Sequence, residues 1–462
     1  MNTPIIRLFG LFVALFALLI AFTSRWAVFG APKLRDDTLN TRAVIEQEQI
    51  KRGLIRADDG SLLAGNVSLS EHRYGRRYPT GRLFALPVGF NDATAGRAGL
   101  EKQYNDRLTG AGNEFAGIVD SLTKKTQVGD DLETTLDPKA QKVAYQQLGG
   151  RSGAVVALDV KTGAVRVLAG TPSFDPENPN DAAKGSQFNL ATQGLYPPGS
   201  TFKTVTAVAA IDSGRYTPDS LVSGRNGKII SGTPLDNDGG ENFGNITLTD
   251  ALTHSVNTVW ATVGESIGKH RLADYMDRFG FGSTPPLDYP SGQLATSGSY
   301  RHGKPISETS TYVDVGRTAI GQALLLVTPL QMAEVAQTIG NGGVRMEPRL
   351  VSKVVDPDGR TVETPLPKRA ERVMSTATAA KLTAMMKQVV KEGTGTAAAL
   401  QGVDVAGKTG TAEINVAQGV NDLWFICFTP KDAVAVVIAH EQGQGGTVAA
   451  PVARAVLQAL GQ

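Results

Sequence analysis

In the stretch YPPGSTFKTVTAVAA, residues 196–210, a segment that disfavours regular structure leads directly into an apolar run. Two prolines and a glycine interrupt regular structure just before Ser200, and the residues after it favour a helix. Lys203 follows Ser200 by three positions, a spacing that makes side chains neighbours on a helix, with Cβ atoms roughly 5–6 Å apart. Apolar neighbours such as Phe202 and Val205 would bury the lysine and disfavour its charge, so that it could act as a base for the serine.

The Ser-x-x-Lys pattern is weak evidence alone because it occurs three times, also beginning at Ser121 and at Ser266. Acyl transferases that use a serine and a lysine carry three motifs in the order SxxK, SxN, KTG. The single SxN of this chain occupies residues 255–257, so Ser266 comes too late in the order. Ser121 lies in a polar segment with no apolar helix behind it. The order therefore selects Ser200 as the candidate nucleophile.

The KTG pattern occurs twice, at residues 161–163 and 408–410. The first copy precedes the SxN and lies between two apolar runs, where a hairpin turn explains its glycine. The second copy lies on a predicted strand, in VAGKTGTAE. Ser200, Ser255 and Lys408 alone fit the required order, and we predict that they meet in one site.

Composition and missing motifs argue against several other classes of protein. The 46 Lys and Arg residues balance 44 Asp and Glu residues, and no basic run is interleaved with aromatics, so we expect no nucleic-acid partner. Five scattered histidines form no HExxH or Cys/His cluster, so we expect no metal and no other cofactor. Cys427 is the single cysteine, which excludes an intrachain disulfide, and we expect it in the core. No GxSxG surrounds Ser200, which argues against a Ser-His-Asp hydrolase.

The N-terminus predicts a membrane anchor. The uncharged run LFGLFVALFALLIAFTS, residues 8–24, lies between Arg7 and Arg25 and reaches about 25 Å as a helix. A cleaved signal peptide is the alternative, but the residues before Ala31 are only a passable cleavage site. We expect a single uncleaved span at the cell membrane, with the rest of the chain outside the cytoplasm.

Residues 31–130 are polar and broken, and we expect them to form a small elongated linker domain. Within it, RGLIRADDGSLLAG predicts a hairpin with residues 57–60 as its turn, and GLEKQYNDRLTG predicts a short helix. The expected division is an anchor over residues 1–30, this linker domain, and a catalytic domain over residues 131–462.

The catalytic segment predicts an α+β fold, an antiparallel sheet flanked by helices. Asp137 is the expected N-cap of a helix that ends at two glycines, and residues 152–170 form the expected early hairpin. A late meander and a terminal helix are expected at residues 403–414, 423–430, 433–441 and 450–461. Two glycine-rich stretches are expected to be loops, GTGTAAAL at 393–400 and GQGGTVAAP at 443–451, and the second could border the cleft.

With these motifs in place, the chain resembles the class B penicillin-binding proteins, which are monofunctional D,D-transpeptidases. YPPGSTFK, SVN and GKTGTAE are similar to the three active-site motifs of that family. LETTLDPKAQ, FNLATQGLYPPGSTFK and IGQALLLVTPLQMAEVAQTIGNGG are similar to further landmarks, so nearly the whole chain is covered. It is most similar to the short actinobacterial penicillin-binding protein A type. The resemblance implies the penicillin-binding protein/β-lactamase-like fold for the catalytic domain.

The resemblance also implies roles for individual residues. Ser200 would attack a D-Ala-D-Ala stem peptide, Lys203 would take its proton, and Ser255 would pass a proton to the departing D-alanine. Asn257, Lys408, Thr409, Gly410 and Thr411 would bind substrate, the threonines gripping its carboxylate and the glycine letting the peptide lie close. The backbone N–H groups of Ser200 and Thr411 would form an oxyanion hole.

The implied function is cross-linking of peptidoglycan in cell-wall elongation or division. The implied partners are donor and acceptor stem peptides, β-lactams as covalent inhibitors, and a membrane glycan polymerase of the SEDS type. Two alternatives stay open. One is a D,D-carboxypeptidase, in which water takes the acyl group, and the other is a non-catalytic scaffold of the cell-wall synthesis complex.

Overall fold

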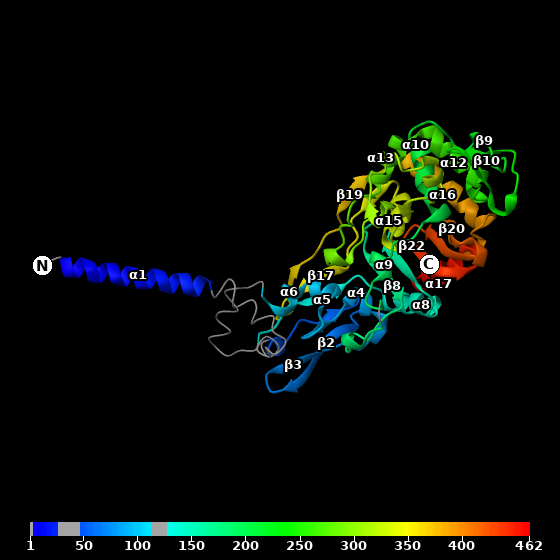
Figure 1. Ribbon diagram of the computed structural model, residues 1–462. Helices are drawn as coiled ribbons and strands as arrows, with labels where there is room; N and C mark the ends of the chain where they lie inside the picture. Colours follow the sequence, from blue (N-terminus) through cyan, green and yellow to red (C-terminus); the bar gives the residue numbers. More distant parts are fainter. Residues whose placement is uncertain (1–2, 26–46, 112–126, 184) are drawn as a thin grey trace.

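The computed structural model describes residues 3–25, 47–111, 127–183 and 185–462 (Figure 1). The SxxK at Ser121, the residues around Ala31 and the expected domain boundary at residue 30 lie outside these ranges. After a separate N-terminal helix, the chain forms a β-rich part and a larger mixed part that carries the C-terminus (Figure 1).

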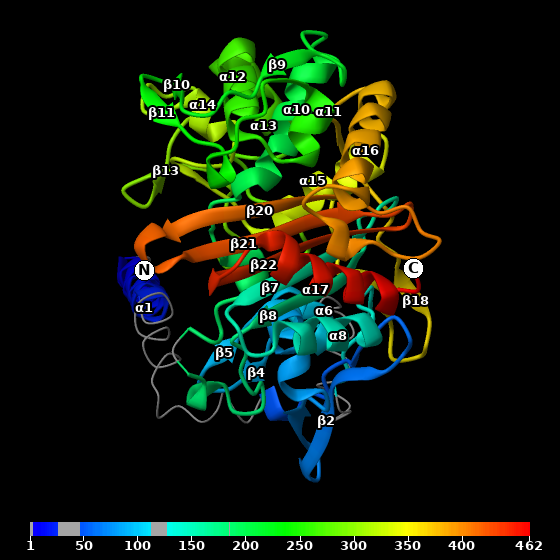
Figure 2. The ribbon, with the colours of Figure 1, turned by 90° about the vertical axis from the view of Figure 1, so that its right-hand side faces the viewer.

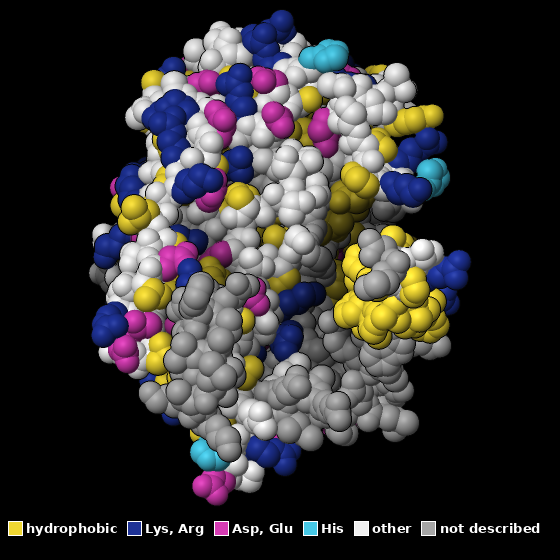
Figure 3. Space-filling view, turned by 90° about the vertical axis from the view of Figure 1, so that its left-hand side faces the viewer, with side chains coloured by type: hydrophobic (Ala, Val, Ile, Leu, Met, Phe, Trp, Pro, Cys, Tyr) yellow, Lys and Arg dark blue, Asp and Glu magenta, His cyan; other side chains and the backbone are white. Residues whose placement is uncertain are grey.

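The N-terminal helix α1, Thr3–Arg25, is long and apolar enough to cross a membrane. Its 23 residues span about 34 Å at 1.5 Å per residue, close to the thickness of a hydrocarbon core. Hydrophobic side chains surround this helix, and none of its residues is buried against the rest of the protein (Figure 3). Such a surface suits a lipid environment better than water.

The first sheet has six strands, and strands from distant parts of the chain build it together. Its order is β18 (Thr361–Glu363), β17 (Val351–Val355), β6 (Asp131–Thr134), β1 (Ile55–Arg56), β2 (Leu62–Ser70) and β3 (Arg73–Arg77). The predicted hairpin is confirmed, because β1 and β2 pair antiparallel around residues 57–61. Only β1 and β6 pair in parallel. The sheet therefore crosses the expected boundary at residue 130.

Buried polar groups fix the junction between the linker part and the catalytic part. The Asp288 carboxylate accepts hydrogen bonds from the backbone N–H groups of Leu350 and Val351 at 2.6 and 2.9 Å. It also accepts one from the Tyr104 hydroxyl at 3.0 Å. Tyr104 lies between α5 (Gly99–Gln103) and α6 (Asn105–Thr109), the two short helices found where one helix was expected. One carboxylate thus ties the linker to β17.

The second sheet carries the catalytic part. Its five strands are antiparallel in the order β20 (Ala406–Asn415), β21 (Val420–Phe428), β22 (Asp432–Gln442), β7 (Gly153–Asp159) and β8 (Val165–Thr171). Helices α8 (Pro138–Leu148) and α17 (Gly445–Ala459) cover one face, and α15 (Pro329–Gly340) packs on the other (Figure 2). The predicted α+β class, hairpin and meander are confirmed, as is the Asp137 cap, which accepts from Ala140 N. Cys427 is fully buried on β21.

A helical part lies beyond the β20 edge of this sheet (Figure 2). It contains α10 (Lys203–Asp212), α11 (Leu248–Thr253), α12 (Asn257–Ile267), α13 (Lys269–Arg278), α14 (Val315–Thr318) and α16 (Thr376–Lys391). The nine residues from Lys203 to Ile211 of α10 are all buried, so neighbours surround the helix that follows Ser200. This packing sets the nucleophile segment at the join between helices and sheet.

Shorter elements complete the fold. The remaining short helices and 3₁₀ turns are η2 (Gly81–Leu83), α4 (Ala85–Val88), η3 (Pro179–Asp181), α9 (Leu190–Gln193), η5 (Asp238–Gly240), η6 (Ser291–Gln293), η7 (Thr396–Ala398) and η8 (Val416–Gln418). The remaining strands are β4 (Asn91–Asp92), β5 (Gly96–Arg97), β9 (Leu221–Ser223), β10 (Lys228–Ile230), β11 (Thr233–Leu235), β12 (Asn245–Thr247), β13 (Gly298–Arg301), β14 (Lys304–Pro305), β15 (Leu325–Leu326), β16 (Val344–Met346) and β19 (Arg369–Arg372).

The expectation of a loop over residues 443–451 was wrong for most of that stretch. Helix α17 begins at Gly445 and continues through Pro451. A β-carbon on Gly445 would lie 2.2 and 2.3 Å from the carbonyl oxygens of Trp424 and Gly410. The glycine is there because the helix start packs directly on the backbone of β20 and β21, not because the segment is a loop.

Candidate active site

Ser200 lies on a turn that the rest of the fold holds from two sides. The turn is the 3₁₀ helix η4 (Gly199–Phe202), which leads directly into α10, so the predicted helix start is confirmed. Gly199 has φ 52 and donates its N–H to the Gly321 carbonyl at 2.9 Å. The Trp424 indole N–H on β21 donates to the Pro197 carbonyl at 3.0 Å. Ser200 is half-buried and lines the main cleft.

Lys203 is the first residue of α10 and is fully buried. Its Nζ donates to the Ser255 carbonyl oxygen and to Asn257 Oδ1, both at 2.6 Å, and lies 3.2 Å from Ser255 Oγ. Burial lowers the pKa of Lys203 well below its usual range, and the nearby Lys408 lowers it further. Both effects favour the neutral amine, which is the form that a base requires.

Ser255 lies between the two buried lysines. It occupies the turn from α11 to α12 and has φ 58, an uncommon conformation for a residue with a side chain. Its hydroxyl oxygen lies 2.9 Å from Lys408 Nζ and 3.2 Å from Lys203 Nζ. A single hydroxyl thus connects the candidate base to the cationic strand.

Lys408 extends from β20 and is fully buried too. Its Nζ contacts Ser255 Oγ, the Thr409 carbonyl oxygen at 3.1 Å and Thr409 Oγ1 at 3.3 Å. Burial lowers the pKa of Lys408 to about 7, so the charged and neutral forms coexist near neutrality. Three oxygens thus surround the Lys408 amine, as they do the Lys203 amine.

The contacts of the two lysines are compatible with a neutral Lys203 beside a charged Lys408. A neutral amine has two N–H donors and one lone pair. Lys203 uses both donors on the Ser255 carbonyl and on Asn257, which leaves the lone pair for a hydroxyl proton. Lys408 as an ammonium ion donates to Ser255 Oγ at 2.9 Å, and Lys203 Nζ lies 3.2 Å from the same oxygen. The site can therefore take a proton at Lys203 and return one through Ser255.

Gly410 lies in the site region and has a packing role that the sequence did not indicate. It does not line the cleft. A β-carbon there would lie 2.8 Å from the Pro198 carbonyl oxygen and 3.0 Å from both Thr201 Cγ2 and Trp424 Cβ. The missing side chain lets the Ser200 turn approach β20, and the expected room for a substrate peptide alongside this strand stays a prediction.

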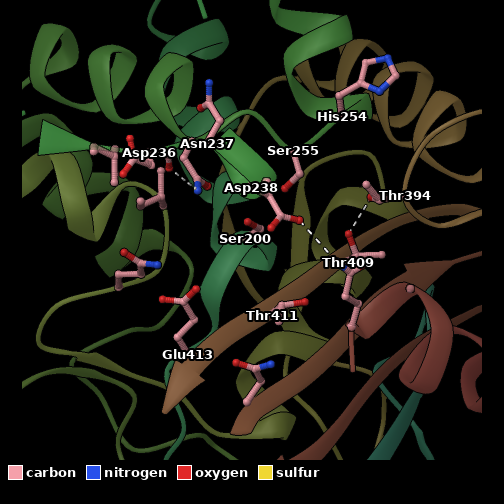
Figure 4. Close-up of a pocket in the computed structure, with 18 of the residues that line it drawn as sticks. Ser200, Asp236, Asn237, Asp238, His254, Ser255, Thr394, Thr409, Thr411 and Glu413 are labelled. Carbon is pink, nitrogen blue, oxygen red and sulfur yellow. Dashed lines mark hydrogen bonds between the residues drawn. The ribbon is translucent and has the colours of Figure 1, made fainter. Parts of the chain in front are cut away.

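The cleft above these residues has a volume of about 540 Å³ (Figure 4). Of the sequence-predicted residues, it exposes Ser200, Ser255, Asn257, Thr409 and Thr411, whereas Lys203 and Lys408 lie beneath its surface. Ser200, Ser255 and Thr411 face the same space in Figure 4. The structure thus gathers the three motifs around one opening.

Sequence reasoning missed several residues that line this opening. They are Asp236, Asn237, Asp238, His254, Arg317, Thr394 and Glu413, among others, whereas Gly443, Gln444 and Gly446 belong to the stretch that was expected to border the cleft. Most lie on loops without a repeating pattern, and only two had a usable signal. His254 directly precedes the SxN, and Thr394 lies in the GTGT stretch. Within the described residues no group of three His, Cys, Asp or Glu side chains is arranged to hold a metal ion.

Family models cover most of the chain. Residues 153–458 match the penicillin binding protein transpeptidase domain, and residues 52–132 match the penicillin binding protein A dimerisation domain. The first of these covers well over half of the chain. It includes Ser200, Ser255 and Lys408.

Individual proteins agree with the family models. Peptidoglycan D,D-transpeptidase PbpA of Mycolicibacterium smegmatis is 32% identical over 99% of both chains, and that of Mycobacterium tuberculosis is 33% identical over 99% of both. The ceftriaxone acyl-enzyme complex of penicillin-binding protein A from M. tuberculosis superposes with a TM-score of 0.80 at 31% identity. It covers 90% of this chain and all of the other. This chain belongs to the penicillin-binding protein transpeptidase family.

Proposed function

We propose that this chain is a peptidoglycan D,D-transpeptidase that acts through Ser200. The Ser200 hydroxyl attacks the carbonyl between the two D-alanines of a stem peptide while Lys203 takes its proton. The carbon–nitrogen bond then breaks, D-alanine leaves with a proton delivered through Ser255, and an acyl-enzyme remains. The observation that carries this proposal is the fully buried Lys203 amine, which lies 2.6 Å from both the Ser255 carbonyl oxygen and Asn257 Oδ1 and 3.2 Å from Ser255 Oγ.

The other site residues bind substrate in this proposal. Asn257 holds the amide on the acyl side, and its side-chain N–H also reaches the Asp236 carbonyl at 3.1 Å. Lys408 supplies positive charge near the terminal carboxylate, and the hydroxyls of Thr409 and Thr411 donate to that carboxylate. The backbone N–H groups of Ser200 and Thr411 form the oxyanion hole. One such donor typically contributes about 3–4 kcal/mol to transition-state stabilisation.

The acyl-enzyme then passes its acyl group to an amine of a neighbouring stem peptide. A new amide forms, and the Ser200 ester bond breaks. A β-lactam enters the same first step but has no separate leaving group, so Ser200 stays acylated. Structures of M. tuberculosis penicillin-binding protein A are such acyl-enzyme complexes, with ceftriaxone, imipenem and penicillin G.

We also propose a membrane location for the enzyme. In this proposal helix α1, which is long and apolar enough to cross a membrane, anchors the chain in a single pass with the catalytic part outside the cytoplasm. Residues 31–130 act as a linker domain between the anchor and the catalytic segment 131–462. A membrane glycan polymerase of the SEDS type, acting in elongation or division, is the proposed assembly partner of the anchor and linker.

Labelling with a fluorescent penicillin tests the nucleophile. We expect the full-length chain in detergent to be labelled covalently and a folded Ser200→Ala variant to stay unlabelled. Ser266→Ala is the matched control, because it removes the serine of a second SxxK and should label normally. A wild-type protein that stays unlabelled, or a Ser200→Ala protein that labels, would move the scaffold alternative to the front. A second assay, with a peptide donor and a D-amino acid acceptor, distinguishes the two reactions. A transpeptidase forms the peptide that contains the acceptor, whereas a carboxypeptidase forms the hydrolysed peptide.

A further inference from the structure

The GTGT stretch at residues 393–396 contributes one residue to the cleft. It joins α16 to β20 and was expected to be an ordinary loop. Thr394 is exposed at the cleft, and its hydroxyl lies 2.7 Å from Thr409 Oγ1 (Figure 4). The next threonine, Thr396, is exposed but does not line the cleft.

The backbone of Thr394 is held from two sides. Its N–H donates to the Thr253 carbonyl at 3.3 Å, two residues before Ser255. A β-carbon on Gly393 would lie 2.4 Å from that same carbonyl oxygen, and one on Gly446 would lie 2.2 Å from the Thr394 carbonyl oxygen. The loop is therefore wedged between the end of α11 and the start of α17. Its hydroxyl is presented to β20 from a fixed position.

The contacts of Thr409 limit where its proton can go. A hydroxyl has one donor and two acceptor lone pairs. Lys408 Nζ–H points at Thr409 Oγ1 from 3.3 Å and occupies one lone pair. An anionic group in the cleft needs the Thr409 proton, so the Thr394 hydroxyl must then donate to the second lone pair. Both lone pairs are filled in this arrangement, and the Thr409 O–H has only the cleft left to face.

We infer that Thr394 is a positioning residue that turns the Thr409 hydroxyl proton toward the carboxylate of the donor peptide or of a β-lactam. This inference rests on the proposed function, because it assumes that Thr409 receives that carboxylate. Thr394 itself touches no reacting atom. Thr394 affects the acylation rate only by orienting the Thr409 hydroxyl. We therefore expect this effect only with ligands that carry a carboxylate.

The test compares benzylpenicillin with its methyl ester, in which the carboxylate is blocked. Acylation rates of the full-length protein in detergent are measured by intact mass spectrometry. We expect Thr394→Val to slow acylation by benzylpenicillin about fivefold to tenfold, the value of one oriented hydrogen bond. Acylation by the ester should stay at the wild-type rate, because the ester offers no anion to the Thr409 proton. Thr394→Ser keeps the hydroxyl and should behave like wild type.

Two controls make the result decisive. Thr396→Val alters a threonine of the same loop that does not reach the cleft, and it should change neither rate. Thr394→Ala repeats the test without the second methyl group of valine, in case that group crowds Thr409. An equal loss with both compounds, a wild-type rate with benzylpenicillin, or a Thr394→Ser variant as slow as Thr394→Val would each overturn the inference. Absence of acylation in the wild type would instead refute the proposed function.

Discussion

A methyl group added at Gly410 should displace the nucleophile turn. In Gly410→Ala the new β-carbon would lie 2.8 Å from the Pro198 carbonyl oxygen and 3.0 Å from Thr201 Cγ2 and Trp424 Cβ. Ordinary contacts between such atoms are about 3.5–4.0 Å, so three neighbours would each have to move by about 0.5 Å or more. The Trp424 side chain also holds the turn through its bond to Pro197, so the strain has no easy outlet.

The overlap predicts losses in both stability and rate. Overpacking of this kind costs about 1–3 kcal/mol, which corresponds to about 2–6 °C in Tm for a domain of this size. Ser200 belongs to the turn that would be displaced. A misplacement of about 1 Å can lower a reaction rate about 100-fold, so acylation by a fluorescent penicillin should slow by about tenfold or more. Thermal unfolding and the time course of labelling measure the two effects.

The matched control is Gly292→Ala, since a β-carbon on Gly292 would meet nothing within 4 Å. It should keep the wild-type Tm and labelling rate. The reasoning is refuted if Gly410→Ala also keeps both. Gly410→Ala could also be stable and label normally but bind the donor peptide poorly. That result would indicate that Gly410 mainly provides room for the substrate.

Three further predictions concern Lys408, Ser255 and Asp288. Acylation should slow as the pH rises through about 7, where Lys408 loses its proton, and Lys408→Arg should remove this alkaline limb in stopped-flow profiles because arginine stays charged. Ser255→Gly should be more stable to thermal unfolding than Ser255→Ala by about 1 kcal/mol, because glycine adopts a positive φ without cost, and a reversed order would contradict this. Asp288→Ala leaves the N–H groups of Leu350 and Val351 without their acceptor and should lower the free energy of unfolding by about 2–4 kcal/mol, whereas Asp288→Asn keeps an acceptor and should lose less.

The core elements of the catalytic part could be predicted because local pattern and position agree there. Strands β21 and β22 of the late meander contain continuous apolar runs, and Asp137 with Pro138 marks a helix start that the structure confirms. The order of the motifs selected Ser200, Ser255 and Lys408. The structure places Ser200 and Ser255 in one cleft, with Lys408 in contact with Ser255 beneath it. These signals lie within short windows of the chain.

Features that depend on distant packing could not be read in this way. The strand pair β6 and β17 joins residues more than 200 positions apart, so neither segment contains a local pattern that predicts its partner strand. Gly445 belongs to a helix because it packs on two strands, although its composition is typical of a loop. Thr394 reaches the cleft from a connection whose sequence has no helical or strand periodicity.

The conformation of Ser255 explains why the SxN motif needs its fold. At φ 58 a residue with a side chain costs about 1–2 kcal/mol relative to the ordinary helical region. That conformation turns the Ser255 carbonyl toward Lys203, which donates to it at 2.6 Å, while the hydroxyl of the same residue reaches Lys408. The carbonyl oxygen accepts one hydrogen bond from the Lys203 amine, and Asn257 Oδ1 accepts another. A serine with ordinary backbone angles would turn its carbonyl away and leave a donor of the buried amine unpaired. The strain at Ser255 therefore helps to keep the lone pair of Lys203 free for a hydroxyl proton.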